Sequence, residues 1–230
     1  VMEVLLGAAM ELVGLMTTLV AERQEDPRDD LTTKLIHSEL GEDLMTPEEV
    51  ASFFILLAVA GNDTTRTAMT HGMNLLHQNP DQRRIWQDDV DGVTDTAVEE
   101  IVRMASPVTF MRRTATGDHT VSSHQFREGD KVVMFYGAAN RDPREFPNPM
   151  QFDVRRDPNN HVGFGGPGPH FCLGAHLARR EISVAFRQLF DRLPDIEVTG
   201  DAVHIESAGI PLVGGIKRLP VRFSPTAPSA

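Results

Sequence analysis

The chain has 230 residues, 40% of them hydrophobic and 24% charged, and a formal net charge of −11. That composition is typical of a globular protein, and the acidic balance, without any basic run, argues against nucleic acid as a partner. The single cysteine cannot form an internal disulfide, which favours a cytoplasmic location. The most apolar run, residues 51–61, is too short to span a bilayer, so no integral membrane association is expected.

The first half of the chain has the pattern of helices. Residues 1–23 carry Glu3 and Glu11 at helical spacing among apolar residues, which predicts an amphipathic helix rather than a signal peptide. The sequence begins inside this pattern, and we expect the natural start to lie upstream. A charged connector follows, and residues 30–40 predict a short second helix.

A long helix is predicted next, from Pro47 to about His77. Thr46 suits the N-cap, Pro47 the first helical position, and Glu49 completes a capping box. Pro80 ends the pattern because the residue before a proline disfavours helical backbone. Such a length predicts a central helix that is buried on several faces.

The remainder mixes helices, strands and coil, so the expected fold class is mainly α with small antiparallel β-sheets. Residues 1–224 are predicted to be the C-terminal part of a single domain, followed by a disordered tail at 225–230. The further elements that we expect are helices over 80–90, 94–106 and 173–193, short strands within 108–135, an ordered coil over 141–160 and a weak C-terminal hairpin.

The only cysteine, Cys172, lies in the stretch HVGFGGPGPHFCLGAH at residues 161–176, directly before a predicted helix. A lone cysteine is most often a small buried hydrophobe. Here the preceding glycines let the backbone pass close to a flat, bulky group, and the start of the helix stabilises a thiolate. Zinc would need more ligands at short spacing, and the nearness of His170 is no evidence of a catalytic pair. A lone thiolate in a glycine loop best suits a haem iron.

The run FGGPGPHFCLG resembles the haem-binding loop of the cytochromes P-450, the haem-thiolate monooxygenases, whose pattern is Phe-Gly-x-Gly-x-His-x-Cys-x-Gly. Phe164 comes one residue early because Gly165 and Gly166 form a doubled glycine. That doubling resembles a soluble bacterial branch of the family that acts on sterol side chains and branched lipids. The positions that match the pattern directly are Gly168, His170, Cys172 and Gly174.

The resemblance implies that the chain is the C-terminal part of the cytochrome P-450 fold, with the N-terminal helices and most of the main sheet absent. It makes Cys172 the axial ligand of the iron of haem b. The other residues that it implies in haem binding are Phe164, Gly165, Gly168, His170, Gly174 and Arg113, with Ala60 and Gly61 from the long helix.

A polar cluster, AGNDTT at residues 60–65, interrupts the apolar pattern of the long helix. Taken singly, its glycine and threonines would indicate no more than a tolerated polar turn. Together they predict a local opening or bend, because glycine costs about 1 kcal/mol against alanine and a threonine can bond back to the helix. The cluster resembles the oxygen-activating helix of the family, which implies that Asp63 relays protons and Thr64 holds oxygen and its water.

Glu100 and Arg103 are three residues apart in a predicted helix. Such a pair by itself indicates a surface salt bridge of little value. The resemblance instead implies the Glu-x-x-Arg core pair of the family, completed by an arginine of the following coil. We assign that arginine to Arg156, with Arg155 as the alternative, and expect the three to be structural rather than catalytic.

Two neighbouring arginines begin the strand region. Guanidinium groups pair well with carboxylates, and the family pattern favours Arg113 over Arg112 as the ligand of one haem propionate, with His170 at the other. Solvated arginines are the plainer alternative. The residues that resemble substrate-lining positions of the family are Val108, Thr109, Phe110 and Ile210, and their apolar character implies a lipophilic substrate.

The resemblance implies a monooxygenase that uses dioxygen as co-substrate and hydroxylates an unactivated carbon of a steroid or branched lipid. Electrons would come from NADH or NADPH through ferredoxin reductase and ferredoxin. The alternatives left open are a peroxygenase, a non-catalytic haem-binding or sensor protein, an inactive truncated fragment and a helical interaction domain without a cofactor.

Overall fold

The structure is a computed structural model that describes residues 2–40, 43–206 and 211–225. The chain divides into two compact units, residues 1–62 and 63–230, and the boundary falls within the long helix α3 (Pro47–Gln78). The assignment of residues 1–224 to one domain stays a prediction, and residues 226–230 of the predicted tail lie outside the described residues.

The first unit is built from two helices, a short hairpin and the beginning of α3. Met16 and Val20 of the first helix form its small apolar core together with Ile36, Val50 and Ala51. The predicted short helix over residues 30–40 is too long, because the backbone after Ile36 pairs within a hairpin instead. The elements are α1 (Met2–Glu25), α2 (Leu31–Ile36), β1 (Glu39–Leu40) and β2 (Asp43–Leu44).

The capping box predicted for α3 is present. The Glu49 backbone N–H donates to Thr46 Oγ1 at 3.2 Å, and the Thr46 N–H donates to Glu49 Oε2 at 2.8 Å. The helix continues without a break through residues 60–65, in agreement with the predicted span from Pro47 to about His77, and the local opening or bend at the polar cluster stays a prediction. The propensity cost of one glycine is about 1 kcal/mol, and a long helix absorbs it.

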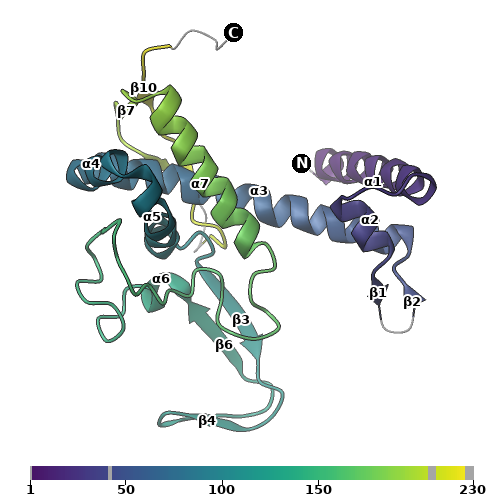
Figure 1. Ribbon diagram of the computed structural model, residues 1–230. Coiled ribbons are helices and arrows are strands. Elements are labelled where there is room, and N and C mark those ends of the chain that lie inside the picture. The colour runs from purple at the N-terminus through teal and green to yellow at the C-terminus, as the bar shows by residue number, and fades with distance from the viewer. Residues whose placement is uncertain (1, 41–42, 207–210, 226–230) are drawn as a thin grey trace. The chain divides into compact units, whose positions relative to one another are not determined.

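The second unit packs three helices against the C-terminal part of α3 around Trp86, Ile101 and Phe186, which are all buried. The Trp86 and Phe186 rings lie 4.9 Å apart, and Figure 1 shows α5 and α7 side by side. The helices are α4 (Pro80–Asp88), α5 (Val90–Ala105) and α7 (Ala175–Arg192).

Helix α5 begins earlier than the sequence pattern predicts. The Asp89 side chain accepts a hydrogen bond from the Gly92 backbone N–H at 2.9 Å and so caps the helix. The acidic run before residue 94 conceals this cap, because any of several aspartates could serve as the N-cap. At the other end, Ser106 takes a left-handed conformation with φ of 39° and stops the helix before Pro107.

The strands of the second unit form two-stranded antiparallel sheets. The longest pairs Phe110 with Phe135 and Thr114 with Lys131, and a short helix that the sequence did not reveal, α6 (Tyr136–Ala139), follows it. The other strands are shorter. The strand bounds are β3 (Phe110–Thr114), β4 (His119–Val121), β5 (His124–Phe126), β6 (Lys131–Phe135), β7 (Glu197–Val198), β8 (Val203–His204), β9 (Ile216–Arg218) and β10 (Val221–Arg222).

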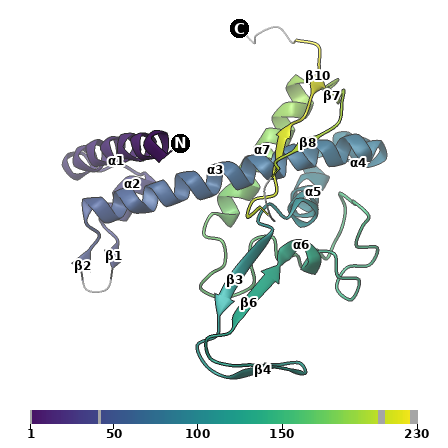
Figure 2. The same ribbon diagram turned by 180° about the vertical axis from the view of Figure 1, so that it is seen from behind.

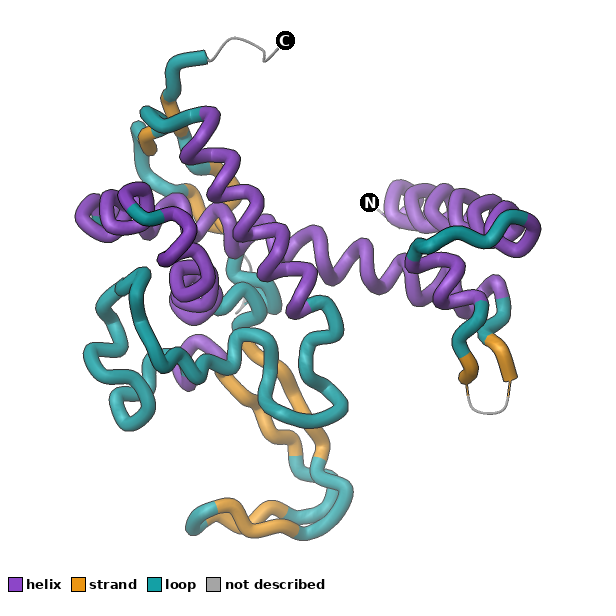
Figure 3. Tube along the Cα trace, in the orientation of Figure 1, coloured by secondary structure: helices purple, strands orange, loops and turns teal. Residues whose placement is uncertain are grey.

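One long segment without regular structure, residues 140–174, joins α6 to α7, as the tube in Figure 3 shows. It contains the predicted coil and, after it, the loop that carries Cys172. The C-terminal segment returns along the second unit, where its strands lie beside α7 and α3 in Figure 2, and Val213 pairs with Val108. The described residues are thus mainly helical with small antiparallel sheets, which confirms the predicted class. None of the described helices has the length and hydropathy of a membrane-spanning segment.

Gly72 of α3 faces side chains of α5 and α7, and it supplies a test of this packing. A Cβ atom at this position would lie 2.7 Å from Ile101 Cδ1 and 2.8 Å from Phe186 Cζ. We expect Gly72→Ala to lower the free energy of unfolding by about 1–3 kcal/mol because the core cannot widen without strain. Chemical denaturation measures this loss.

The matched control is Gly14→Ala in α1, where an added Cβ meets no atom within 4 Å. Alanine is the better helix former by about 1 kcal/mol, so this variant should be as stable as the wild type or more stable. Equal stability of both alanine variants would contradict the close packing at Gly72.

Candidate active site

The loop that carries Cys172 is closed by its own backbone hydrogen bonds. The Cys172 N–H donates to the Phe164 carbonyl at 2.9 Å, and the Phe171 N–H donates to the Gly168 carbonyl at 3.0 Å. Gly165 and Gly168 have φ of +89° and +127°, which side chains rarely tolerate. The glycines therefore allow the tight path that brings the cysteine to the start of α7.

Cys172 is exposed, and so are the apolar side chains on either side of it. Phe171 is 44% exposed, Leu173 73% and Leu177 62%. A Cβ at Gly166, Gly168 or Gly174 would meet no atom within 4 Å, so the loop leaves open space. A free thiol amid exposed apolar side chains and open glycines fits a flat apolar group with a thiolate-binding metal, and the described part of the chain therefore fits haem.

No cluster of three or more histidine, cysteine, aspartate or glutamate side chains that could hold a metal ion occurs in the described ranges. A multidentate site of the zinc type is therefore not formed by those residues. Cys172 remains the candidate metal ligand.

Glu100 and Arg103 are both completely buried. Arg103 Nε donates to Glu100 Oε2 at 2.7 Å, and its Nη2 donates to Oε1 at 2.8 Å. Arg103 also donates to the carbonyls of Asn140 and Pro149, both at 2.8 Å. The bidentate pair thus ties α5 to the coil after α6.

A second arginine joins the same carboxylate from the coil. Arg156 Nε donates to Glu100 Oε2 at 3.1 Å, whereas Arg155 is exposed and its backbone N–H donates to Asp153 Oδ1. The structure therefore brings Arg156, and not Arg155, to Glu100. The Asp153 N–H also donates to Glu100, at 3.0 Å, so this carboxylate organises the coil that leads to the cysteine loop.

The predicted propionate ligands lie at the surface of the second unit. His170 and Arg112 are exposed and Arg113 is half-buried. Arg113 Nη1 donates to the Arg112 carbonyl at 3.1 Å. None of the three pairs with a carboxylate among the described residues, and their role at haem stays a prediction.

Of the predicted substrate-lining residues, Val108, Thr109 and Phe110 lie at the start of the β3 region, and Ile210 lies outside the described residues. Thr109 is fixed to the returning tail, since its N–H donates to the Leu212 carbonyl at 2.9 Å. Because side chains alternate along a strand, Phe110 and Arg113 lie on opposite faces of β3. Met111 shares the face of Arg113, and strand alternation could have identified it from the sequence.

The oxygen-activating residues predicted from the polar cluster lie on consecutive turns of α3. Ala60 and Gly61 belong to the first unit, and Asp63 and Thr64 to the second. The Asp63 carboxylate pairs with Arg66, whose Nη2 lies 2.5 Å from Oδ1. Gly61 has open space at the position of a Cβ. The roles of these four residues stay predictions.

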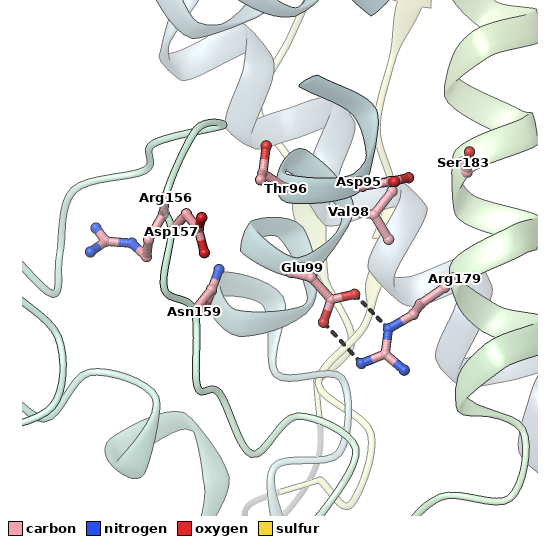
Figure 4. A pocket seen from close by; sticks show the side chains of 9 residues that line it. All are labelled: Asp95, Thr96, Val98, Glu99, Arg156, Asp157, Asn159, Arg179 and Ser183. Atoms are coloured by element: carbon pink, nitrogen blue, oxygen red, sulfur yellow. Dashed lines mark hydrogen bonds and ion pairs between the residues drawn. The ribbon is translucent and has the colours of Figure 1, made fainter. Parts of the chain in front are cut away.

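Sequence reasoning missed a second carboxylate site beside the cysteine loop. Figure 4 shows Glu99 and Arg179 joined across a pocket of about 490 Å³ between α5, α7 and the coil, and His161 Nε2 lies 2.8 Å from Glu99 Oε2. Burial raises the pKa of Glu99, but the hydrogen bonds from His161 and Arg179 outweigh it and lower the pKa to about 2. The adjacent glutamates at 99 and 100 were the only feature of the sequence that pointed to this second site.

Comparison with known proteins gives the family. The family model that matches is that of the cytochromes P-450, over residues 3–194. A methyl-branched lipid omega-hydroxylase from Mycobacterium tuberculosis is 50% identical over 213 residues, which make up 92% of this chain and 49% of that protein. A steroid C26-monooxygenase from Rhodococcus jostii is 44% identical over 217 residues, which make up 94% of this chain and 45% of that protein.

A solved structure agrees with these relatives. The Mycobacterium marinum cytochrome P-450 in complex with pseudoionone is 45% identical, with a TM-score of 0.84 over 93% of this chain and 51% of that one. The chain spans about half the length of the curated relatives that it matches, in agreement with the predicted partial fold. The resemblance read from the cysteine loop is confirmed: the chain belongs to the cytochrome P-450 family.

Proposed function

We propose that this chain supplies the haem-thiolate and oxygen-activating part of a monooxygenase that hydroxylates an unactivated carbon of a methyl-branched lipid or steroid. The observation that carries the proposal is the exposed Cys172 thiol in a glycine loop surrounded by exposed apolar side chains. The names of the relatives at 50% and 44% identity support the substrate class. In this proposal residues 1–224 are part of one catalytic domain.

A haem bound at the loop would supply an iron centre at which dioxygen is reduced and one oxygen atom is inserted into a C–H bond. Cys172 would hold the metal as a thiolate, which the start of α7 stabilises. Arg113, with Arg112 as the alternative, and His170 would bind the two propionates. Glu100, Arg103 and Arg156 would keep the coil and the loop in place.

Asp63 and Thr64 would handle the protons. Asp63 is half-buried and paired with Arg66, and it would serve as the relay between solvent and the reacting oxygen. The Thr64 hydroxyl would hold a water at the reacting oxygen. Electrons are proposed to come from NADH or NADPH through a ferredoxin reductase and a ferredoxin.

The function is tested by turnover of the haem-loaded protein with ferredoxin, reductase and NADPH. A methyl-branched fatty acid and a steroid with an aliphatic side chain are the two substrates, and mass spectrometry detects a product heavier by one oxygen atom. Hydroxylated product supports the proposal. A haem protein that gives no product with either substrate, although its iron is reduced, would contradict it and favour a sensor or binder.

Thr64→Ala is expected to separate oxygen use from product formation. Haem binding and reduction do not need the hydroxyl, but without it protons would no longer be directed to the correct oxygen atom. We expect the amount of product formed per NADPH oxidised to fall roughly 3- to 10-fold while hydrogen peroxide rises. Such a factor corresponds to about 1 kcal/mol lost from the free-energy difference that favours product formation over peroxide release. Asp63→Asn should instead slow NADPH oxidation and leave more of the coupling intact.

The matched control is Thr70→Ala on the same helix, where the Thr70 hydroxyl donates to the Arg66 carbonyl at 2.8 Å. This variant removes a threonine hydroxyl bonded within α3 and should keep wild-type coupling. Wild-type coupling in Thr64→Ala as well would show that Thr64 has no part in oxygen activation.

A further inference from the structure

Glu99 and Glu100 are neighbours in α5, yet they serve two different parts of the chain. Consecutive residues of a helix point in different directions. Glu100 is fully buried and binds Arg103 and the coil at Arg156. The Glu99 side chain is 26% exposed and binds His161 and Arg179 instead. Glu100 therefore holds the coil, and Glu99 holds residues on both sides of the cysteine loop.

The two partners of Glu99 bracket the cysteine loop. His161 precedes Cys172 in the chain, and Arg179 follows it in the second turn of α7. His161 Nδ1 accepts from the Gly163 N–H at 3.0 Å, so its Nε2 carries the proton and donates to Glu99. Arg179 Nη2 donates to Glu99 Oε2 at 2.9 Å. One carboxylate thus closes both ends of the loop.

Arg179 also lies against the loop itself. Its guanidinium carbon is 4.4 Å from the centre of the Phe164 ring, and the Phe164 carbonyl accepts the Cys172 N–H at 2.9 Å. The pKa of Arg179 is raised first by its hydrogen bond to Glu99 and further by the negative charges of Glu99 and Cys172. The guanidinium therefore lies against the residue whose carbonyl holds the backbone of Cys172.

We propose that the Glu99–Arg179 pair positions the cysteine loop and sets the electron donation of the Cys172 thiolate, an inference that rests on the proposed function. Arg179 withdraws electron density from the sulfur, and Glu99 limits that withdrawal by partly neutralising the cation. Charges beyond the ligand itself are a known means of tuning a metal centre. Glu99 and Arg179 are positioning residues in this role and touch no substrate.

A purely structural ion pair would behave differently. If the pair only braced α5 against α7, removal of either partner would loosen the loop in the same way. A tuning pair has a sign, because a positive charge near the iron favours the reduced form and a negative charge opposes it. The two partners should therefore move the reduction potential in opposite directions.

The test measures the reduction potential of the haem iron, and the absorption of its reduced carbon-monoxide adduct, in the haem-loaded protein. Arg179→Gln should lower the potential and Glu99→Gln should raise it. Each change should alter the equilibrium constant of reduction about 3- to 10-fold, which is roughly 30–60 mV for a one-electron couple. The double variant should return most of the way to the wild-type potential.

The chain offers a matched control in a second ion pair between the same two helices. Asp91 of α5 pairs with Arg187 of α7, and neither residue contacts the cysteine loop in the described structure. Asp91→Asn and Arg187→Gln should leave the potential unchanged. Arg179→Lys keeps the charge and should stay near the wild-type potential. If Glu99→Gln does not bind haem, the difference in potential between Arg179→Lys and Arg179→Gln still tests whether the charge of Arg179 sets the potential.

Shifts of the same sign in Glu99→Gln and Arg179→Gln would overturn the proposal. So would equal shifts in Arg179→Lys and Arg179→Gln, or shifts of similar size in the control pair. A wild-type protein without a thiolate-type carbon-monoxide band would refute the ligand role of Cys172, which is a failure of the proposed function and is seen before any charge variant is made.

Discussion

Replacing Cys172 by serine or histidine is expected to abolish the thiolate-type absorption band of the reduced carbon-monoxide complex. The chain contains no other cysteine, so no second thiolate can take its place at the iron. The strong electron donation that shifts this band belongs to sulfur and is not reproduced by an alcohol or an imidazole. The measurement is the reduced carbon-monoxide difference spectrum of the purified holoprotein.

Cys172→Ala extends the test to activity. This variant can keep haem through the apolar surroundings and the proposed propionate contacts, yet it should lose hydroxylation completely. The control is His176→Ala, which changes an exposed side chain one turn after the cysteine and should keep the thiolate band. An unchanged band in Cys172→Ser or Cys172→His would refute the assignment of the ligand.

Glu100→Ala and Arg103→Ala are each expected to reduce the amount of folded, haem-loaded protein rather than to slow one chemical step. Both side chains are completely buried, and loss of either leaves the other charge without its partner. Breaking a buried pair in this way costs about 3–5 kcal/mol, a large part of the stability of a typical domain. Denaturant titration and the yield of holoprotein measure the effect.

An exposed pair supplies the control for this prediction. Arg144 is 88% exposed and pairs with Asp142 in the coil after α6. Arg144→Ala removes the same kind of charge and should change the stability by no more than about 1 kcal/mol. If Glu100→Ala and Arg103→Ala both gave stable holoproteins whose turnover alone was reduced, the structural role of the pair would be wrong.

Several features of the molecule follow from short stretches of sequence. The capping box at Thr46 and Glu49 is local, because both of its hydrogen bonds lie within one helical turn. The glycines of the cysteine loop likewise act on their own backbone, and Gly165 and Gly168 have the positive φ that only glycine adopts readily. The family assignment rested on this loop, which is contiguous in the sequence.

Other features depend on contacts between distant residues. The choice of Arg156 over Arg155 is made by the path of the coil, which turns one side chain toward Glu100 and the other to solvent. Glu99 meets His161 across 62 positions of the sequence and Arg179 across 80. No periodicity or spacing rule links residues so far apart.

The sequence by itself determined the chemistry that the chain carries: one thiol, its glycine loop, an acid and an alcohol in one helix, and a Glu-x-x-Arg pair. Only the tertiary structure decided that the pair is buried, that Arg156 rather than Arg155 reaches Glu100, and that Glu99 pairs with His161 and Arg179. The physical reason is that burial and charge pairing are properties of the packed chain, because each side chain acquires its neighbours only when α5, α7 and the coil come together.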